Sequence, residues 1–367
     1  MQTCVKCVLN DRYPGLTFNP QGECSFCEHY QHFKPIGEEA LIAEFERARH
    51  RAARKKIGFD VMVPLSGGKD STFMLYLAAR KYGLRVLTMT YDNGFLSDLA
   101  RKNIETTVSR AGVQHLFVRP DPVIRQKVYR AMFRLTGDIC GACDIGTNTS
   151  ILKVSADHKI PLILSGVSPL ENDSFVPDSI QDTARFRHVL KESGTLTRRE
   201  INRYMIYPRL NYFSQTLLKR TGYFGRLVFP LFYIDNPSDK EMGKIIHEEL
   251  GWTDSTASEY TKHFDCIAEP FTNYARNCIY GYERRICQYS NLVRRNEITR
   301  EQALNLLEQD RLWEMPAGVE PVLDYLGVEK DDLPGILAYP PLKYERYTSR
   351  VNRLFGRIKK MKDKLAS

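Results

Sequence analysis

The sequence predicts an α/β protein with a doubly wound parallel sheet, an N-terminal zinc ribbon and a C-terminal helical region. Between residues 59 and 235, apolar runs of strand length alternate with segments of helical period. This alternation is typical of a parallel sheet with helices on both faces. Two Cys-x-x-Cys pairs precede it, and helical patterns follow it. The expected units are a zinc knuckle over 1–35, a linking helix over 36–58, the α/β domain over 59–235 and the helical region over 236–367.

The first unit is a candidate metal site. Cys4-x-x-Cys7 and Cys24-x-x-Cys27 are separated by sixteen residues, a spacing typical of two-knuckle zinc sites. Each pair forms a tight turn that presents two thiolates, and four thiolates complete the tetrahedral coordination of Zn²⁺. Because such a site is closed, we expect a structural ion without a catalytic role. An iron–sulfur centre or free thiols are the alternatives.

The period of the apolar residues places the elements of the α/β domain. The predicted strands are Asp60–Leu65, Arg85–Tyr91, His115–Arg119 and Pro161–Ser165, and the predicted helices are Thr72–Lys81, Ser97–Ala111, Pro122–Leu135 and Ile145–His158. Farther along, the expected elements are a strand over Leu227–Ile234, a helix over Ser238–Leu250 and a helix that begins with a capping box of Thr299 and Gln302. The polar stretch 172–225 is a candidate for contacts with a substrate.

The most informative motif is Ser66-Gly67-Gly68-Lys69-Asp70-Ser71, which follows the first predicted strand and opens the first helix. A strand, a glycine turn and a helix in this order direct backbone N–H groups and the positive helix end toward one point, which suits a phosphate. The spacing of a Walker A loop is absent.

This hexapeptide resembles the SGGxDS signature of the PP-loop, or N-type ATP pyrophosphatase, superfamily, whose fold is HUP-like. The resemblance implies that ATP and Mg²⁺ adenylate an acceptor oxygen, and that a nitrogen or sulfur nucleophile then displaces AMP. Lys69 would offset the charge of the departing pyrophosphate, and Asp70 would place the magnesium ion. The residues expected to hold the nucleotide are Ser66, Gly67, Gly68, Lys69, Asp70 and Ser71.

Two further strand ends belong to the expected nucleotide site. Ligands of doubly wound sheets bind beyond the carboxyl ends of the strands, which brings Asp92 and Gly166 to the same edge as the motif. The resemblance places the end of the second strand near adenine. The alternative for both positions is an ordinary turn.

A second set of cysteines suggests sulfur chemistry. Cys140-Gly-Ala-Cys143 is a third Cys-x-x-Cys pair, and Cys266 stands far away in the sequence. With the PP-loop motif, this set resembles the [4Fe-4S]-dependent tRNA thiolation enzymes, in which three thiolates hold a cluster whose open iron carries a hydrosulfide. The resemblance nominates Cys140, Cys143 and Cys266 as cluster ligands, with Cys143 and Cys266 as catalytic residues. A persulfide passed between them without a cluster is the alternative. The lone Cys278 and Cys287 are expected to be small apolar side chains.

The overall layout resembles a different family, the N-acetyl sugar amidotransferases. The order of the N-terminal knuckle, the PP-loop motif and the segment Leu292–Leu304 carries this resemblance. It implies that ammonia from a glutaminase subunit is placed on the acetamido group of a nucleotide-sugar or glycan. Typical members lack the cysteines at 140 and 143. The expected function is therefore adenylation followed by sulfur transfer, with the amidotransferase as the alternative. A nucleotide-sensing or RNA-binding protein with an inactive PP-loop is a third hypothesis.

The charge and the hydropathy of the chain limit the kinds of partner that we expect. The net charge of +9 favours an anionic partner, and nucleic acid is one candidate. The two resemblances imply an acceptor that is either tRNA or a small molecule such as a nucleotide-sugar, together with a sulfur donor or a glutaminase. No apolar stretch reaches bilayer length and no secretory signal is visible, so we expect a cytoplasmic protein without membrane contact. An a/d stripe from Tyr344 to Leu365 is expected to dock on the body or to form a homodimer, and its basic face is a candidate RNA contact.

Overall fold

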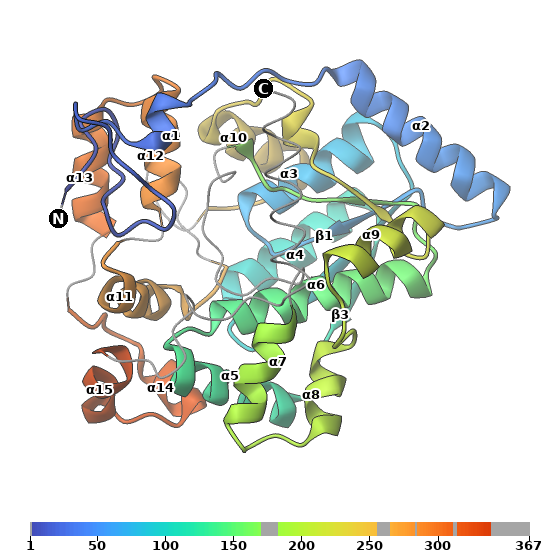
Figure 1. The fold of residues 1–367 in the computed structure, drawn as a ribbon. Coiled ribbons are helices and arrows are strands. Elements are labelled where there is room, and N and C mark those ends of the chain that lie inside the picture. The colour runs from blue at the N-terminus through green and yellow to red at the C-terminus, as the bar shows by residue number, and fades with distance from the viewer. Residues whose placement is uncertain (1, 170–182, 255–264, 283–284, 311–313, 339–367) are drawn as a thin grey trace.

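The computed structural model describes residues 2–169, 183–254, 265–282, 285–310 and 314–338 (Figure 1). The stripe from Tyr344 to Leu365, and with it the predicted homodimer helix, lies outside the described residues.

Five parallel strands form the central sheet and confirm the doubly wound prediction. The strand order is β3-β2-β1-β4-β5, so the chain extends the sheet first from β1 toward β3 and then, on the other side of β1, toward β5. Val61 of β1 pairs with Val86 on one side and with Leu162 on the other. The order reverses between β1 and β4, where doubly wound sheets form their ligand crevice. The strands are β1 (Val61–Pro64), β2 (Val86–Tyr91), β3 (Gln114–Val118), β4 (Leu162–Leu164) and β5 (Arg226–Val228).

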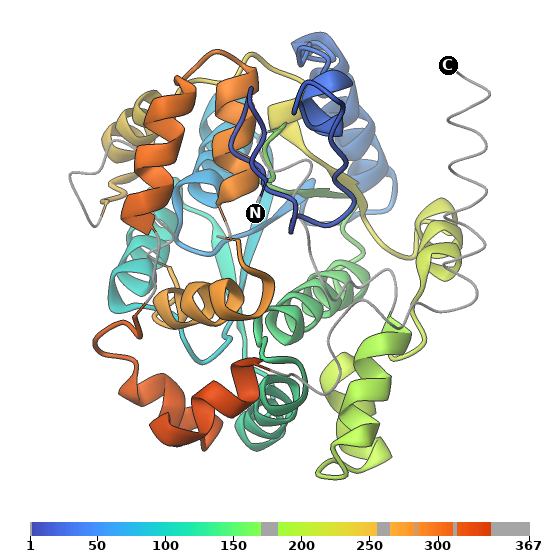
Figure 2. The same cartoon turned by 60° about the vertical axis from the view of Figure 1, so that its left-hand side comes forward.

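Helices cover both faces of the sheet and form the periphery (Figures 1 and 2). Up to β5 the helices are α1 (Ser25–Glu28), α2 (Glu38–Arg54), α3 (Lys69–Tyr76, continued by the π-helical turn Leu77–Lys81), α4 (Asp98–Ala111), α5 (Pro122–Thr136), α6 (Cys140–Asp157), α7 (Thr183–Glu192), α8 (Arg198–Met205) and α9 (Tyr212–Thr221). After β5 they are the 3-10 turn η3 (Pro230–Phe232), α10 (Asp239–Leu250), α11 (Glu269–Tyr280), α12 (Ile286–Arg294), α13 (Arg300–Asp310), α14 (Glu320–Leu326), the 3-10 turn η4 (Lys330–Asp332) and α15 (Leu333–Ala338).

Alternate residues of β1 pack against different helices. Val61 and Val63 share a buried apolar cluster with side chains of α3 and α10, whereas Met62 packs in another cluster with Val154 of α6. This is the period of two expected for a strand buried on both faces. Because α10 packs on α3 and α4, residues beyond position 235 complete one face of the sheet.

Two predicted elements were wrong in extent. The strand expected over Leu227–Ile234 ends at Val228, because Pro230 has no amide hydrogen for a ladder and begins the turn η3 instead. The helix expected from Ile145 begins at Cys140, where the backbone N–H donates to Asp138 Oδ1 at 2.8 Å. The third Cys-x-x-Cys pair therefore lies in the first turn of α6 and not in a loop before it.

The N-terminal knuckle is not a freestanding unit. Its buried residues, among them Cys4, Leu9 and Tyr13, share one core with Ile286 of α12 and Leu307 of α13. Figures 1 and 2 show the N-terminal trace beside these two helices. None of the described helices is long and apolar enough to cross a bilayer.

Candidate active site

The loop after β1 is shaped by two glycines. Gly67 has φ +84°, and a Cβ there would lie 2.5 Å from the carbonyl oxygen of Ala100 in α4, so only glycine fits. Its own carbonyl oxygen accepts a hydrogen bond from Trp252 Nε1 at 2.9 Å. Gly68 is the N-cap of α3. The loop therefore passes tightly over α4 and directs the N-terminus of α3 at the β1–β4 crevice.

Two serines close the loop on itself. The hydroxyls of Ser66 and Ser71 lie 3.2 Å apart, and the backbone N–H of Ser66 donates to Ser71 Oγ at 3.1 Å. The backbone N–H of Gly68 donates to Ser66 Oγ at 3.2 Å. Both hydroxyls thus stand beside the helix N-terminus, where an anion is favoured.

Lys69 is a buried cation between two carboxylates. Its Nζ lies 2.5 Å from Asp70 Oδ1 and 2.9 Å from Asp239 Oδ1, and the residue is only 5% exposed. Burial by itself lowers the pKa of Lys69, but the two carboxylates outweigh it and raise the pKa above its ordinary value. Lys69 is therefore charged at any working pH and serves as an electrostatic partner, not as a base.

A cavity of about 990 Å³ opens between the ends of β1 and β4. Of the predicted nucleotide residues, its lining includes Ser66, Gly68, Lys69, Asp70, Ser71 and Gly166. Gly166 contacts the motif directly, because a Cβ there would lie 2.9 Å from the backbone carbon of Asp70. The expected polar stretch contributes Gln215, Lys219 and Gly225.

Two predicted nucleotide residues do not line this cavity within the described part of the chain. Gly67 faces α4, as its contact with Ala100 shows. Asp92, in the turn after β2, accepts a hydrogen bond from Gly94 N at 3.0 Å and pairs with Arg119 at 3.3 Å.

The C-terminal region supplies another wall of the cavity. Backbone pairing of Cys266 with Leu96 carries this segment to the strand ends, where the N–H of Ser97 donates to the carbonyl of Asp265 at 3.1 Å. A methyl group at Gly68 would lie 3.7 Å from Asp265 Oδ2. The residues after position 254 that line the cavity are Asp265, Gln288, Leu292, Arg295, Glu297 and Ile298.

Sequence reasoning missed Asp239, Asp265 and Arg295. Asp239 begins the helix predicted after Ser238, but no spacing links it to the motif. A carboxylate beside a predicted helix N-terminus is a weak signal, since such residues are favoured there for the helix dipole alone.

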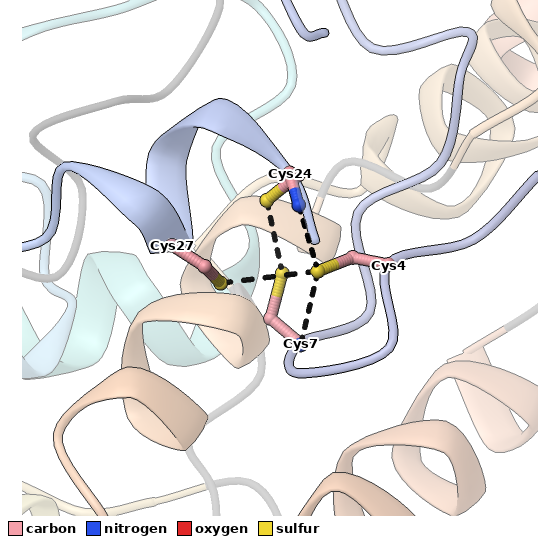
Figure 3. A group of neighbouring side chains, drawn as sticks. All are labelled: Cys4, Cys7, Cys24 and Cys27. Carbon is pink, nitrogen blue, oxygen red and sulfur yellow. Dashed lines mark hydrogen bonds between the residues drawn. The ribbon is translucent and has the colours of Figure 1, made fainter. Parts of the chain in front are cut away.

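The four N-terminal cysteines converge as predicted (Figure 3). Their sulfur atoms lie within 4.8 Å of one another, with Cys4 and Cys27 3.9 Å apart and Cys7 and Cys24 3.7 Å apart. Tetrahedral zinc with Zn–S bonds of about 2.3 Å requires sulfur separations of roughly 3.8 Å. Three backbone N–H groups donate to Cys4 Sγ at 3.3 to 3.4 Å. The donor set and its spacing therefore fit one tetrahedral metal ion.

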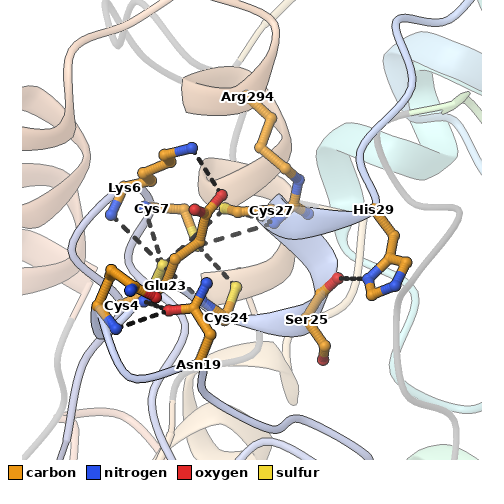
Figure 4. A network of polar contacts seen from close by, with 11 residues as sticks. Cys4, Lys6, Cys7, Asn19, Glu23, Cys24, Ser25, Cys27, His29 and Arg294 are labelled. Atoms are coloured by element: carbon orange, nitrogen blue, oxygen red, sulfur yellow. Dashed lines mark hydrogen bonds and ion pairs between the residues drawn. The ribbon is translucent and has the colours of Figure 1, made fainter.

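An arginine from α12, Arg294, lies beside the four sulfurs of this candidate metal site (Figure 4). Arg294 Nη1 donates to Cys7 Sγ at 3.7 Å and to Cys27 Sγ at 3.9 Å, and the residue is buried. Hydrogen bonds from the thiols of Cys24 and Cys27, together with the Arg294 charge, lower the pKa of Cys7, whereas the pKa values of Cys24 and Cys27 are raised. A positive side chain here offsets part of the charge of four thiolates. The next residue, Arg295, lines the large cavity, so the knuckle supports one of its walls.

The second cysteine set is less compact. Burial and, to a smaller extent, the neighbouring Cys143 and Cys140 thiols together raise the pKa of Cys266 to about 12, so the three lie near one another. Burial also raises the pKa of Cys143, whose sulfur accepts from Asn93 Nδ2 at 3.6 Å. Among the described residues, only the N-terminal group meets the 4.8 Å spacing of a single-ion site. Within the same residues, the cavity lining contains Asp144 and Asp265 but none of these three thiols.

The comparisons with known proteins bear on the C-terminal region. Residues 254–362, less than a third of the chain, match the family model "LPS biosynthesis protein WbpG-like, C-terminal domain". No curated protein sequence matches the chain significantly. Among solved structures, NMN synthetase from Francisella tularensis is 12% identical and has a TM-score of 0.36, with 78% of this chain and 100% of that chain covered. A TM-score of this size does not by itself establish a common fold. By its motif, sheet and C-terminal match, the chain resembles the PP-loop superfamily and, within it, the sugar amidotransferases.

Proposed function

We propose that this protein is an ATP-dependent amidotransferase that adenylates the acetamido oxygen of a sugar acceptor and replaces that oxygen with nitrogen. One observation carries the proposal. The PP-loop and the WbpG-like segment line the same cavity, with Lys69 on one side and Asp265 and Arg295 on another. Nucleotide chemistry and acceptor recognition thus share one space.

The proposed first step uses the residues at the start of α3. The amide oxygen of the acceptor attacks the α-phosphorus of ATP, the bond to the β-phosphate oxygen breaks, and pyrophosphate leaves. Lys69 and the N-terminus of α3 stabilise the charge on pyrophosphate. The carboxylates of Asp70 and Asp239 suit the Mg²⁺ that accompanies the nucleotide.

In the proposed second step, ammonia attacks the activated carbon. AMP leaves with the original acceptor oxygen, a proton is lost, and an acetamidino group remains. Ammonia would come from a glutaminase subunit in the cell and from an ammonium salt in the test tube. A structural Zn²⁺ at Cys4, Cys7, Cys24 and Cys27 would hold the wall that carries Arg295.

Sulfur transfer is the second candidate, favoured by the mutual proximity of Cys140, Cys143 and Cys266. As free thiols, Cys143 and Cys266 are protonated at neutral pH and therefore poor nucleophiles. A donor set of three partly buried thiols fits a [4Fe-4S] cluster, which would keep them deprotonated and supply the sulfur. We rank this candidate second, because the three thiols are outside the described cavity lining and the C-terminal match is to a sugar-modifying family.

The product mass distinguishes the two candidates. Purified protein is incubated with ATP, Mg²⁺ and nucleotide-linked N-acetyl sugars, with either ammonium or sulfide as the donor. Exchange of oxygen for NH lowers the acceptor mass slightly, whereas exchange for sulfur raises it. Acceptor-dependent AMP with the lighter product supports the amidotransferase. A heavier product, obtained only with iron-loaded protein, supports sulfur transfer, and no AMP with any acceptor contradicts both.

Lys69→Met tests the role of the PP-loop in the same assay. We expect the rate of AMP formation to fall at least about 100-fold, as when an oxyanion donor is removed. Lys81→Met is the matched control, because Lys81 lies at the far end of the same helical segment on an exposed ion pair with Glu38. Equal activity of the two variants would contradict the assignment of Lys69.

A further inference from the structure

A second cavity of about 430 Å³ lies between the knuckle and the α/β domain. Five of its eleven lining residues carry an aromatic ring. Phe26, His29, Tyr30 and Phe33 come from the segment that begins at the second Cys-x-x-Cys pair, and Phe232 comes from the turn η3. Phe33 and Phe232 meet edge to face, with ring centroids 5.9 Å apart.

This wall suits a flat ring. Aromatic side chains bind nucleobases by stacking, and such stacking tolerates different bases. The lining also includes the polar side chains of Gln31 and Asn291. The cavity thus combines aromatic rings with polar groups, as expected for a ligand with an aromatic ring and polar edges.

One residue connects this cavity with the large one. Arg295 lines both, and its guanidinium lies 5.9 Å from the centroid of the Phe33 ring. A guanidinium is well suited to phosphate, because its N–H groups donate in pairs to two oxygens. A ligand whose ring lies on the aromatic wall would therefore place attached phosphates at Arg295, on the way to the PP-loop cavity.

We propose that the second cavity binds the nucleobase of a nucleoside diphosphate-linked acceptor, with the diphosphate at Arg295 and the linked sugar in the PP-loop cavity. This inference rests on the proposed function for the identity of the sugar end. ATP has its own phosphate site at Lys69, so acceptor nucleotide and ATP bind together. Arg295 pairs with Glu297 at 2.5 Å, so the diphosphate would join an existing ion pair at this point.

The test measures binding without turnover. Calorimetry with UDP, CDP and GDP is performed in the presence of a saturating non-hydrolysable ATP analogue, which keeps the PP-loop site filled. We expect at least one nucleoside diphosphate to bind, and Phe33→Ala to weaken that binding about tenfold or more, since stacking is lost. The affinity for the ATP analogue should change less than about threefold, because it is held by other residues.

Phe59→Ala is the matched control. Phe59 is a partly buried aromatic residue that precedes β1 and packs at the opposite edge of the sheet, against His158. It should leave nucleoside diphosphate binding unchanged. Photo-crosslinking by an azido-UDP provides a second measurement, and the labelled peptide is expected within residues 25–33.

Three outcomes overturn the inference. In the first, no nucleoside diphosphate binds once the ATP site is filled. In the second, Phe33→Ala and Phe59→Ala weaken binding equally and no label appears within 25–33. In the third, a phosphate-free N-acetyl sugar is as good an acceptor as its nucleotide-linked form, in which case the amidotransferase proposal stands. A different result separates the two proposals. If a nucleoside diphosphate binds and Phe33→Ala weakens its binding, but no acceptor gives AMP, the proposed function is refuted and the nucleobase subsite is still supported.

Discussion

The two cysteine groups of this protein differ in how their geometry is encoded. The N-terminal thiols come from two pairs close in sequence, and their sulfurs converge to tetrahedral spacing. The second group joins the first turn of α6 to Cys266, which reaches α6 only through backbone pairing with Leu96. A group encoded by local spacing forms a metal site that can be recognised in the sequence, whereas a group assembled by tertiary pairing depends on the packing of everything between its members.

Their electrostatic surroundings differ as well. Three backbone N–H groups donate to Cys4 Sγ, and Arg294 donates to the sulfurs of Cys7 and Cys27. In this group the pKa of Cys7 is lowered, whereas the pKa values of Cys24 and Cys27 are raised, in part by burial beside the other thiols. Around Cys143 and Cys266, burial dominates and favours the protonated thiols. Both groups therefore need a metal ion or cluster to hold every sulfur as a thiolate, but the first also has a cation and N–H donors directed at its sulfurs.

Loss of one knuckle thiolate should have the largest effect. Cys7→Ser breaks the four-sulfur set, and the shared core with α12 and α13 depends on it. We expect loss of the bound metal and a cost above about 4 kcal/mol in unfolding free energy, as for other losses of structural metals. Metal analysis and thermal unfolding measure both.

The control for this change is Cys287→Ala. Cys287 is buried in the same core but is not one of the four converging thiols. It should retain the metal and cost only about 1 kcal/mol. Full metal retention in Cys7→Ser would show that the two cysteine groups do not differ as described.

Removal of the arginine behind the sulfurs should have a moderate effect. Arg294→Gln deletes the guanidinium beside Cys7 and Cys27, and we expect metal affinity to fall about 10- to 100-fold, as for other residues that support metal ligands. Chelator competition measures the change. Arg134→Gln, an exposed arginine that donates to the carbonyl of Gly327, should leave the affinity unaltered. Equal affinities in both variants would remove Arg294 from the metal site.

The raised pKa of Cys266 predicts a smaller, pH-dependent effect. With a folded pKa of about 12 and an unfolded pKa near 8.5, the folded chain keeps a proton that the unfolded chain loses. Stability from this group is complete below about pH 8.5 and falls as pH rises toward 12, by at most roughly 1.4 kcal/mol per pH unit. Cys266→Ala should flatten the decline in urea midpoints above pH 9.

An anaerobic preparation sharpens this comparison. If the second group holds a cluster, its sulfurs are already deprotonated, so wild type with bound iron should show a flatter alkaline slope than the same protein after iron is removed. Equal slopes for wild type and Cys266→Ala in metal-free protein would contradict the raised pKa itself.

The smallest effect is expected at Cys278. It is an exposed residue of α11. Cys278→Ser should change the unfolding free energy by no more than about 0.5 kcal/mol and leave metal content unchanged. A loss of metal here would show that a thiol outside both groups takes part.

Much of the fold was predictable because it follows from local rules. The first four strands were placed to within one residue by their period, and the capping box of Thr299 and Gln302 is present, with hydrogen bonds of 2.8 and 3.1 Å. The errors lie where local signals compete. The apolar run after Leu227 has the composition of a strand, but the missing amide hydrogen of Pro230 ends the ladder.

The sequence by itself determined the four-thiol knuckle and the phosphate loop, because fixed spacings within a few residues define both geometries. Only the tertiary structure decided that Asp239 pairs with Lys69, that Asp265 faces the loop, and that Arg295 joins two cavities. These contacts depend on the packing of α10 on α3 and on the pairing of Cys266 with Leu96. The period of apolar residues along the chain cannot predict such long-range packing. The packing arises from the burial of whole faces of helices and strands, not from the spacing of neighbouring residues.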